Sequence, residues 1–156
     1  MNLIDLVQHL AEPLDVAVVV TDAEFVRPGP TILYVNPAFL RMSGYEAQEV
    51  LARTPRMMQG PGTSREGTRQ VQRALRTQER FLGRLQNYRK SGEAYLCEID
   101  VRPILRLDGS TEAFIAFERE VVRRRGRPSG EGAGRYRPID ENRLVGFLPL
   151  EAPLFG

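Results

Sequence analysis

Residues 32–45 read Ile-Leu-Tyr-Val-Asn-Pro-Ala-Phe-Leu-Arg-Met-Ser-Gly-Tyr, which is the strongest local structural signal in the chain. Residues 32–35 predict a strand. Asn36 before Pro37 is typical of an N-cap followed by a first-turn proline, so a helix begins there. Gly44 ends this helix, because glycine accepts the left-handed conformation at a helix C-terminus. We therefore expect a strand that leads directly into a short helix.

Upstream of this unit the sequence predicts a partner strand and a cap helix. Residues 16–21 form a continuous run rich in β-branched side chains, and a Pro/Gly loop at 27–30 separates them from residues 32–35. Residues 1–13 carry an apolar stripe at helical spacing, which Pro13 ends. We expect the two strands to pair, and the amphipathic N-terminal cap helix to dock on an apolar surface.

Downstream of residue 45 the sequence predicts a series of helices. Two short helices are expected near 46–51 and 55–58, and the Gly-Pro-Gly run at 60–62 forces a loop. Ser64 can then cap a longer helix with an apolar inner face and an arginine- and glutamine-rich outer face.

From residue 80 the apolar period changes to two, which predicts three strands at about 80–89, 94–106 and 112–122. The dipeptides Ser91-Gly92 and Asp108-Gly109 between them are typical hairpin turns. Two strands, then helices, then three strands predict an α+β fold, with an antiparallel sheet and helices on one face. In strand 94–106 the inner face is apolar and includes Cys97, whereas the outer face carries Glu98, Asp100 and Arg102.

Strand 112–122 differs, because Ile115 and Phe117 make its outer face apolar as well. An apolar outer face predicts a partner surface. Together with the stripe of the cap helix it predicts a homodimer. The expected dimer surface comprises Leu3, Leu6, Val7, Leu10, Ile115 and Phe117. The apolar C-terminal segment is the competing cover for this face, either within its own subunit or on a second copy.

Composition divides the chain into a cap helix at 1–13, a folded domain at 14–122, a basic Gly-rich linker at 123–134 and an apolar tail at 135–156. The arginines at 123–127 lack the aromatic interleaving and the recognition helix of nucleic-acid binders. We interpret them as a solvated linker and expect no nucleic-acid partner.

The composition of the 156 residues also excludes several protein classes. No apolar run approaches the roughly 18 residues that span a bilayer, and the N-terminus has no basic region of a secretory signal. We expect a cytoplasmic protein with no membrane partner. One cysteine and one histidine argue against a disulfide framework, most zinc sites and His-based triads, so we expect no metal site and no enzyme.

Several strings, in this order and at this spacing, resemble the PAS superfamily and, within it, the LOV (light-oxygen-voltage) flavin photosensors. They are Val20-Thr21-Asp22, residues 32–45, Gln59-Gly60-Pro61 and residues 87–92. The resemblance covers residues 16–122, so that 14–122 is a PAS/LOV-like domain. It implies a five-stranded antiparallel sheet flanked by helices, with flavin mononucleotide (FMN) held between helices and sheet.

The resemblance also implies a photoactive cysteine, whose thiol bonds to the excited flavin ring. Pro55 occupies that position here. Proline has no nucleophile, so the cysteinyl-flavin adduct cannot form at this residue.

The flavin contacts of the family are only partly kept. The resemblance places Arg56 and Arg65 near the phosphate, Gln59 near the ribityl chain and Asn87 at the ring edge. Thr54, Cys97 and Glu118 replace two asparagines and the glutamine that faces the ring. The candidate cofactor-binding residues are therefore Thr54, Arg56, Gln59, Arg65, Asn87, Cys97 and Glu118. The same residues also admit a structural role, as buried hydrogen-bonding groups, solvated arginines and a small core cysteine.

Two functions remain open from the sequence. The first is a sensory PAS module of LOV type without adduct photochemistry, which acts as a regulatory dimer by binding an unidentified signalling protein. The alternative is a sensor of a small ligand, either flavin or another planar molecule, that signals by redox state or occupancy.

Overall fold

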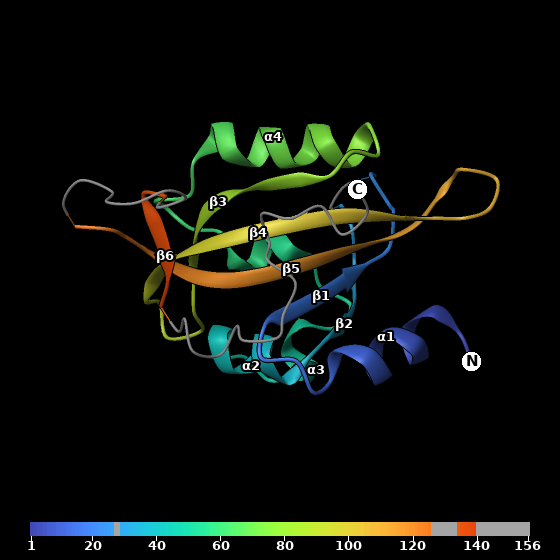
Figure 1. Cartoon of the computed structure of the whole chain (residues 1–156), viewed down its shortest axis with the longest axis horizontal. Helices are drawn as coiled ribbons and strands as arrows, with labels where there is room; N and C mark the ends of the chain where they lie inside the picture. Colours follow the sequence, from blue (N-terminus) through green and yellow to red (C-terminus); the bar gives the residue numbers. More distant parts are fainter. Residues whose placement is uncertain (27–28, 126–133, 140–156) are drawn as a thin grey trace.

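The computed structural model describes residues 1–26, 29–125 and 134–139, and its centre is a six-stranded antiparallel sheet (Figure 1). The strands are β1 (Ala17–Thr21), β2 (Ile32–Val35), β3 (Phe81–Tyr88), β4 (Ala94–Leu105), β5 (Thr111–Arg123) and β6 (Tyr136–Pro138). Their order is β2-β1-β5-β4-β3, and β6 pairs with β5. The five predicted strands and their antiparallel pairing are confirmed. The short strand β6 was not predicted. It lies at the start of the segment 135–156, which was predicted to be an apolar tail.

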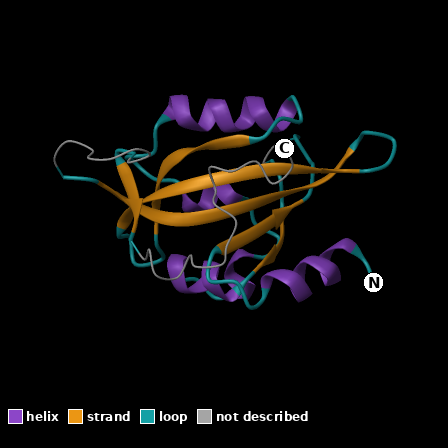
Figure 2. Cartoon of the chain, in the orientation of Figure 1, coloured by secondary structure: helices purple, strands orange, loops and turns teal. Residues whose placement is uncertain are grey.

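Four helical segments cover the inner face of the sheet (Figure 2). They are α2 (Pro37–Ser43), α3 (Ala47–Val50), the 3-10 helix η1 (Pro55–Met58) and α4 (Arg65–Arg76). Phe39 of α2 and Val50 of α3 pack against Val19 of β1, and Val71 and Leu75 of α4 pack on β3, β4 and β5. Because the inner side chains of the strands alternate with outer ones, these helices meet an apolar surface.

The predicted start of α2 is confirmed, and its N-cap has a wider role. The Asn36 side chain accepts a hydrogen bond from the backbone N–H of Phe39 (3.1 Å) and another from that of Val18 (2.8 Å). Its amide donates to the carbonyls of Ala11 (3.0 Å) and Val16 (2.9 Å). Fully buried, Asn36 therefore joins α2 to β1 and to the N-terminal helix.

The N-terminal helix, α1 (Leu3–Ala11), is the predicted cap helix and lies on the opposite face of the sheet from the other helices (Figure 1). Val7 of α1 packs in a cluster with Val18 of β1, and Ile115 and Phe117 of β5 are partly buried against that cluster. The physical reason is that these strands are apolar on both faces, so the stripe of α1 finds its surface within the same chain.

Most of the predicted linker and of the predicted tail, residues 126–133 and 140–156, lies outside the described residues. The packing of the apolar tail therefore stays a prediction. In the described part of the chain no helix is long and apolar enough to cross a membrane.

Candidate functional site

A cavity of about 140 Å³ lies between the inner face of the sheet and the helices. Its walls are mostly apolar. They include Val19, Val71, Leu75, Leu85, Ile99, Val101 and Phe114. Polar side chains enter from three places: the segment 54–59, helix α4 through Thr68 and Gln72, and the inner face of the sheet. A mostly apolar cavity with a few convergent polar groups is the usual form of a ligand site.

The segment 54–59 places its side chains through the local structure of η1. Thr54 is the N-cap, and its hydroxyl accepts a hydrogen bond from the backbone N–H of Arg56 (3.2 Å). Pro55 lies in the first turn of η1. Backbone N–H groups in a first turn have no acceptor within the helix, so the lack of an N–H in proline costs no hydrogen bond there. These residues and Gln59 line the cavity, and the side chains of Arg56 and Gln59 are exposed, so they lie at its mouth.

On the sheet side, Asn87 and Glu118 are buried and reach the cavity. The Cys97 thiol donates a weak hydrogen bond to Glu118 Oε2, at 3.7 Å. Burial raises the pKa of Glu118 to about 7, although the bond from Cys97 works in the opposite direction. Burial, followed by the nearby Glu118 charge, raises the pKa of the Cys97 thiol well above its ordinary value. Near neutral pH Glu118 can therefore donate or accept a hydrogen bond, whereas Cys97 stays a protonated thiol.

The structure brings most of the candidate residues together. The cavity is lined by Thr54, Pro55, Arg56, Gln59, Asn87 and Glu118. Arg65 is exposed at the start of α4, and Cys97 is fully buried beside Glu118; neither is part of the lining. Thr68 of α4 also lines the cavity and was not predicted. Helical periodicity predicts the apolar inner face of a helix, but it does not predict which polar side chain at the edge of that face points inward.

Arg89, at the end of β3, was also missed by the sequence analysis. Its guanidinium lies 4.4 Å from the centre of the Tyr95 ring and donates hydrogen bonds to the Met42 carbonyl (2.7 Å) and to Glu120 (2.8 Å). It therefore ties α2 to β4 and β5. These partners are distant in sequence, and only its pairing with Glu93 at i+4 across the hairpin turn gave a local signal.

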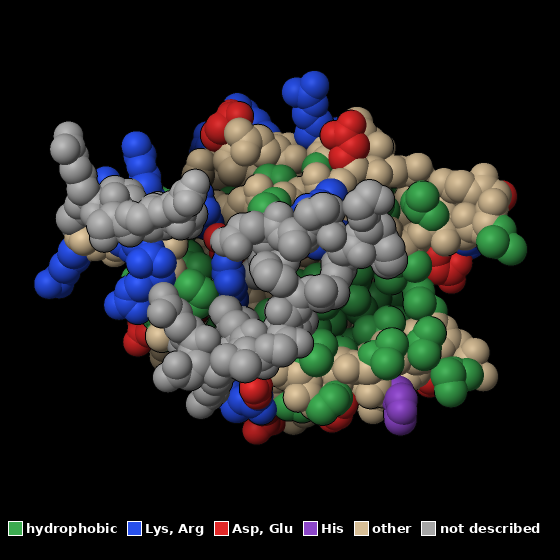
Figure 3. Space-filling model, viewed as in Figure 1, with side chains coloured by type: hydrophobic (Ala, Val, Ile, Leu, Met, Phe, Trp, Pro, Cys, Tyr) green, Lys and Arg blue, Asp and Glu red, His purple; other side chains and the backbone are tan. Residues whose placement is uncertain are grey.

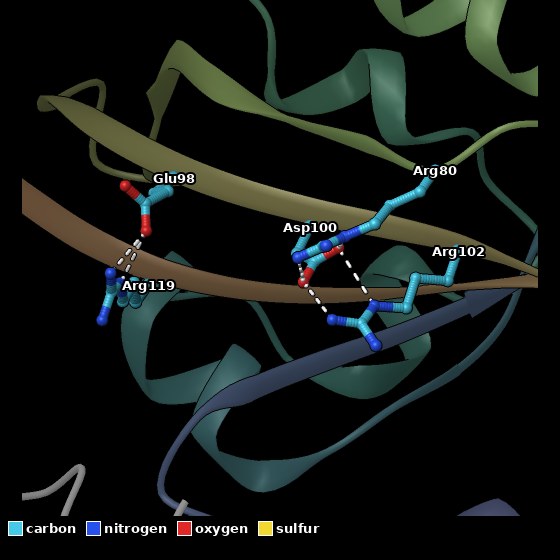
Figure 4. Close-up of polar contacts among 5 residues, drawn as sticks. All are labelled: Arg80, Glu98, Asp100, Arg102 and Arg119. Carbon is cyan, nitrogen blue, oxygen red and sulfur yellow. Dashed lines mark hydrogen bonds and ion pairs between the residues drawn. The ribbon is translucent and has the colours of Figure 1, made fainter. Parts of the chain in front are cut away.

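On the outer face of the sheet two buried carboxylates are held by arginines, and Figure 4 shows both carboxylates with three of these arginines. Asp100 accepts hydrogen bonds from Arg80 Nε (2.9 Å) and Arg102 Nη2 (2.8 Å), and Glu98 pairs with Arg119 at 2.6 Å. Burial works to raise the pKa of Asp100, but the bonds from its two arginines outweigh it and hold that pKa below its ordinary value. These acids face away from the cavity, as alternation predicted, and their arginine partners help to cover them.

A family description, "PAS domain", matches residues 15–122. This chain belongs to the PAS domain family. Among curated relatives, a nitrogen fixation regulatory protein of Klebsiella oxytoca is 33% identical over 112 residues, which cover 72% of this chain and 22% of that protein. A blue-light-activated histidine kinase of Brucella abortus is 34% identical over 95 residues, which cover 61% and 19%. The PAS chain thus matches only 19–22% of the length of these bacterial relatives.

Solved structures place this PAS domain near the LOV domains. An RNA-binding light-oxygen-voltage receptor superimposes with a TM-score of 0.68 at 26% identity, covering 76% of this chain and 33% of that one. The LOV domain of a blue-light-activated histidine kinase from Erythrobacter litoralis gives 0.64 at 25% identity, covering 69% and 96%. The predicted PAS/LOV fold is confirmed, and the chain is a sensory signalling domain of this type.

The residues of the cavity fit one part of a flavin nucleotide better than the other. At the mouth, the Arg56 guanidinium and the Thr54 and Gln59 side chains suit a phosphate or its neighbouring hydroxyls. The interior does not fit the ring as it stands. Its volume of about 140 Å³ is well below the roughly 300–1,000 Å³ of sites for drug-sized ligands, and Glu118 offers a carboxyl where the resemblance implies an amide. A tricyclic ring would require the cavity to widen.

Proposed function

We propose that this PAS domain is a sensory and regulatory module that lacks cysteinyl-flavin photochemistry and transmits its state by protein–protein contact. The observation that carries the proposal is the position of Pro55 in the cavity lining, where the LOV resemblance implies the photoactive cysteine. Cys97 is the one cysteine of the chain, it lies on the sheet, and its pKa is raised. Since a thiolate is the reactive form, Cys97 is a poor substitute. Blue light on the chain with FMN added tests this proposal, because an adduct bleaches the flavin reversibly.

The alternative is a sensor of a small planar ligand, and the buried polar pair Asn87 and Glu118 favours it. If that ligand is a flavin, the triple variant Pro55→Cys, Cys97→Asn, Glu118→Gln should bind FMN at least about tenfold more tightly than the wild type. The reason is that each unmet buried polar contact costs about 1–3 kcal/mol. Flavin retained through gel filtration measures this, with Glu112→Gln as an exposed control outside the cavity. A triple variant that stays colourless would rule out a flavin site.

We also propose that the domain signals as a homodimer and passes its output to a further signalling protein. Part of the expected dimer surface is already occupied, because Val7 is buried in its own chain and α1 partly covers Ile115 and Phe117. Leu6 and Leu10 of α1 remain 44% and 61% exposed. Figure 3 shows hydrophobic side chains gathered between α1 and the β4–β5 hairpin. A two-fold contact through the outer side of α1 would bury both leucines.

A further inference from the structure

The exposed side of α4 carries four arginines and forms a ridge, defined as Arg65, Arg69, Arg73 and Arg76. At 3.6 residues per turn the four side chains fall within an arc of roughly 80°, with successive residues about 4.5–6 Å apart along the helix axis. In Figure 3 basic side chains rise from the edge of the molecule that α4 forms, with acidic ones beside them. Within the described residues, no ion pair joins any of these four guanidinium groups to a carboxylate.

The packing of α4 fixes the direction of this ridge. Val71, Ala74 and Leu75 are directed into the core between α4 and the sheet, so the arginines on the other side of the helix are held facing solvent. Like charges at i,i+4 destabilise a helix, and Arg65–Arg69 and Arg69–Arg73 are two such pairs. The nearest acids in sequence are Glu66, which accepts a hydrogen bond from Gln70, and Glu79 beyond the helix end. The four guanidinium groups outnumber these two exposed acids, so the ridge carries a net positive charge.

We propose that the α4 ridge binds the phosphate backbone of a nucleic-acid duplex without reading its sequence. A guanidinium matches a phosphate with two parallel hydrogen bonds, and a duplex presents a phosphate charge about every 1.7 Å along its axis. A protein partner would need an apolar centre within the patch, but the exposed side chains beside these arginines, Glu66, Gln70 and Thr77, are polar. The expectation of no nucleic-acid partner came from the linker arginines at 123–127, and the ridge is a different set.

The test is fluorescence anisotropy of the full chain with a labelled DNA duplex of about 20 base pairs, several times longer than the ridge. Four phosphate contacts predict that affinity falls by about a hundredfold between about 50 and 200 mM salt. Replacing the ridge by glutamine (R65Q, R69Q, R73Q, R76Q) should remove at least about a hundredfold of affinity at 50 mM salt and flatten the salt dependence. Its thermal midpoint should stay the same or rise, because the like-charge pairs are gone.

The matched control removes four exposed arginines elsewhere: R123Q, R124Q, R125Q and R137Q. It lowers the net charge by the same amount and should keep most of the affinity. Absence of wild-type binding at 50 mM salt would overturn the proposal. Equal losses in the two variants, or a loss in the control alone, would also overturn it, because binding would then follow net charge or the linker. Wild-type binding to phosphatidylserine vesicles but not to the duplex would make the ridge a membrane site instead.

Discussion

Glu118 is a buried carboxyl at a position where the LOV resemblance implies an amide. It is a carboxyl in an apolar wall, and its hydrogen-bond partner is the Cys97 thiol, a weak donor. Burial therefore raises its pKa from 4.5 to about 7. The folded protein holds this carboxyl protonated over a pH range in which the unfolded chain has already ionised it.

We predict that Glu118 makes the domain less stable as pH rises. Because the folded pKa is the higher one, its contribution is fully present below about pH 4.5 and is lost as pH rises to about 7. The loss should be about 3 kcal/mol across this window. Urea unfolding of wild type and Glu118→Gln at a series of pH values measures it, with Glu112→Gln as control. Parallel stability curves for wild type and Glu118→Gln would contradict the prediction.

Single residues also show where sequence reasoning stops. Alternation assigned Cys97 to the inner face and Asp100 to the outer face, and both assignments are confirmed. Alternation does not predict what covers a face. Asp100 is fully buried and accepts hydrogen bonds from Arg80 and Arg102. Arg80 does not lie on β4, the strand that carries Asp100, so alternation along that strand could not predict this partner.

At the scale of elements, the two N-caps Asn36 and Ser64 look alike in sequence and differ in the structure. Ser64 is exposed and caps only α4, whereas Asn36 also bonds β1 and the end of α1. We predict that Ser64→Ala lowers the free energy of unfolding by about 1 kcal/mol. Asn36→Ala should lower it by at least about 3 kcal/mol, because it leaves several buried backbone groups without partners.

Chemical denaturation of the two cap variants measures this difference. If both lose the same stability, Asn36 acts as an ordinary cap and its bonds to Ala11, Val16 and Val18 contribute nothing net. A loss confined to Asn36→Ala, with Ser64→Ala unchanged, would still support the larger role of Asn36 while showing that the α4 cap is dispensable.

Elements with a strong local signal were predictable, and those that depend on distant partners were not. The Asn36-Pro37 start, the Gly44 end and the turns at 91–92 and 108–109 are confirmed because each signal is contained in a few adjacent residues. Strand β6 has three residues with no alternation, and it exists by pairing with β5. The stripe of α1 predicted docking but could not specify its own sheet rather than a second copy.

For the whole molecule, the predicted homodimer can be tested on the outer side of α1. Leu6→Arg with Leu10→Arg should halve the mass measured by light scattering, because charge on these exposed side chains blocks burial against a second copy. Leu107→Arg in the β4–β5 hairpin, where the side chain is fully exposed, is the matched control and should leave the mass unchanged. A wild type that scatters as one chain at high micromolar concentration would exclude the dimer.

The absence of a cysteinyl-flavin photocycle from this PAS domain of LOV type is tested most directly by the light-minus-dark absorbance spectrum of the chain with FMN added. Pro55→Cys in the background Cys97→Asn, Glu118→Gln provides the comparison, because it restores a thiol to the cavity lining. The account predicts no reversible loss of the blue flavin band in the wild type. Bleaching of the wild type under blue light with recovery in the dark would contradict it.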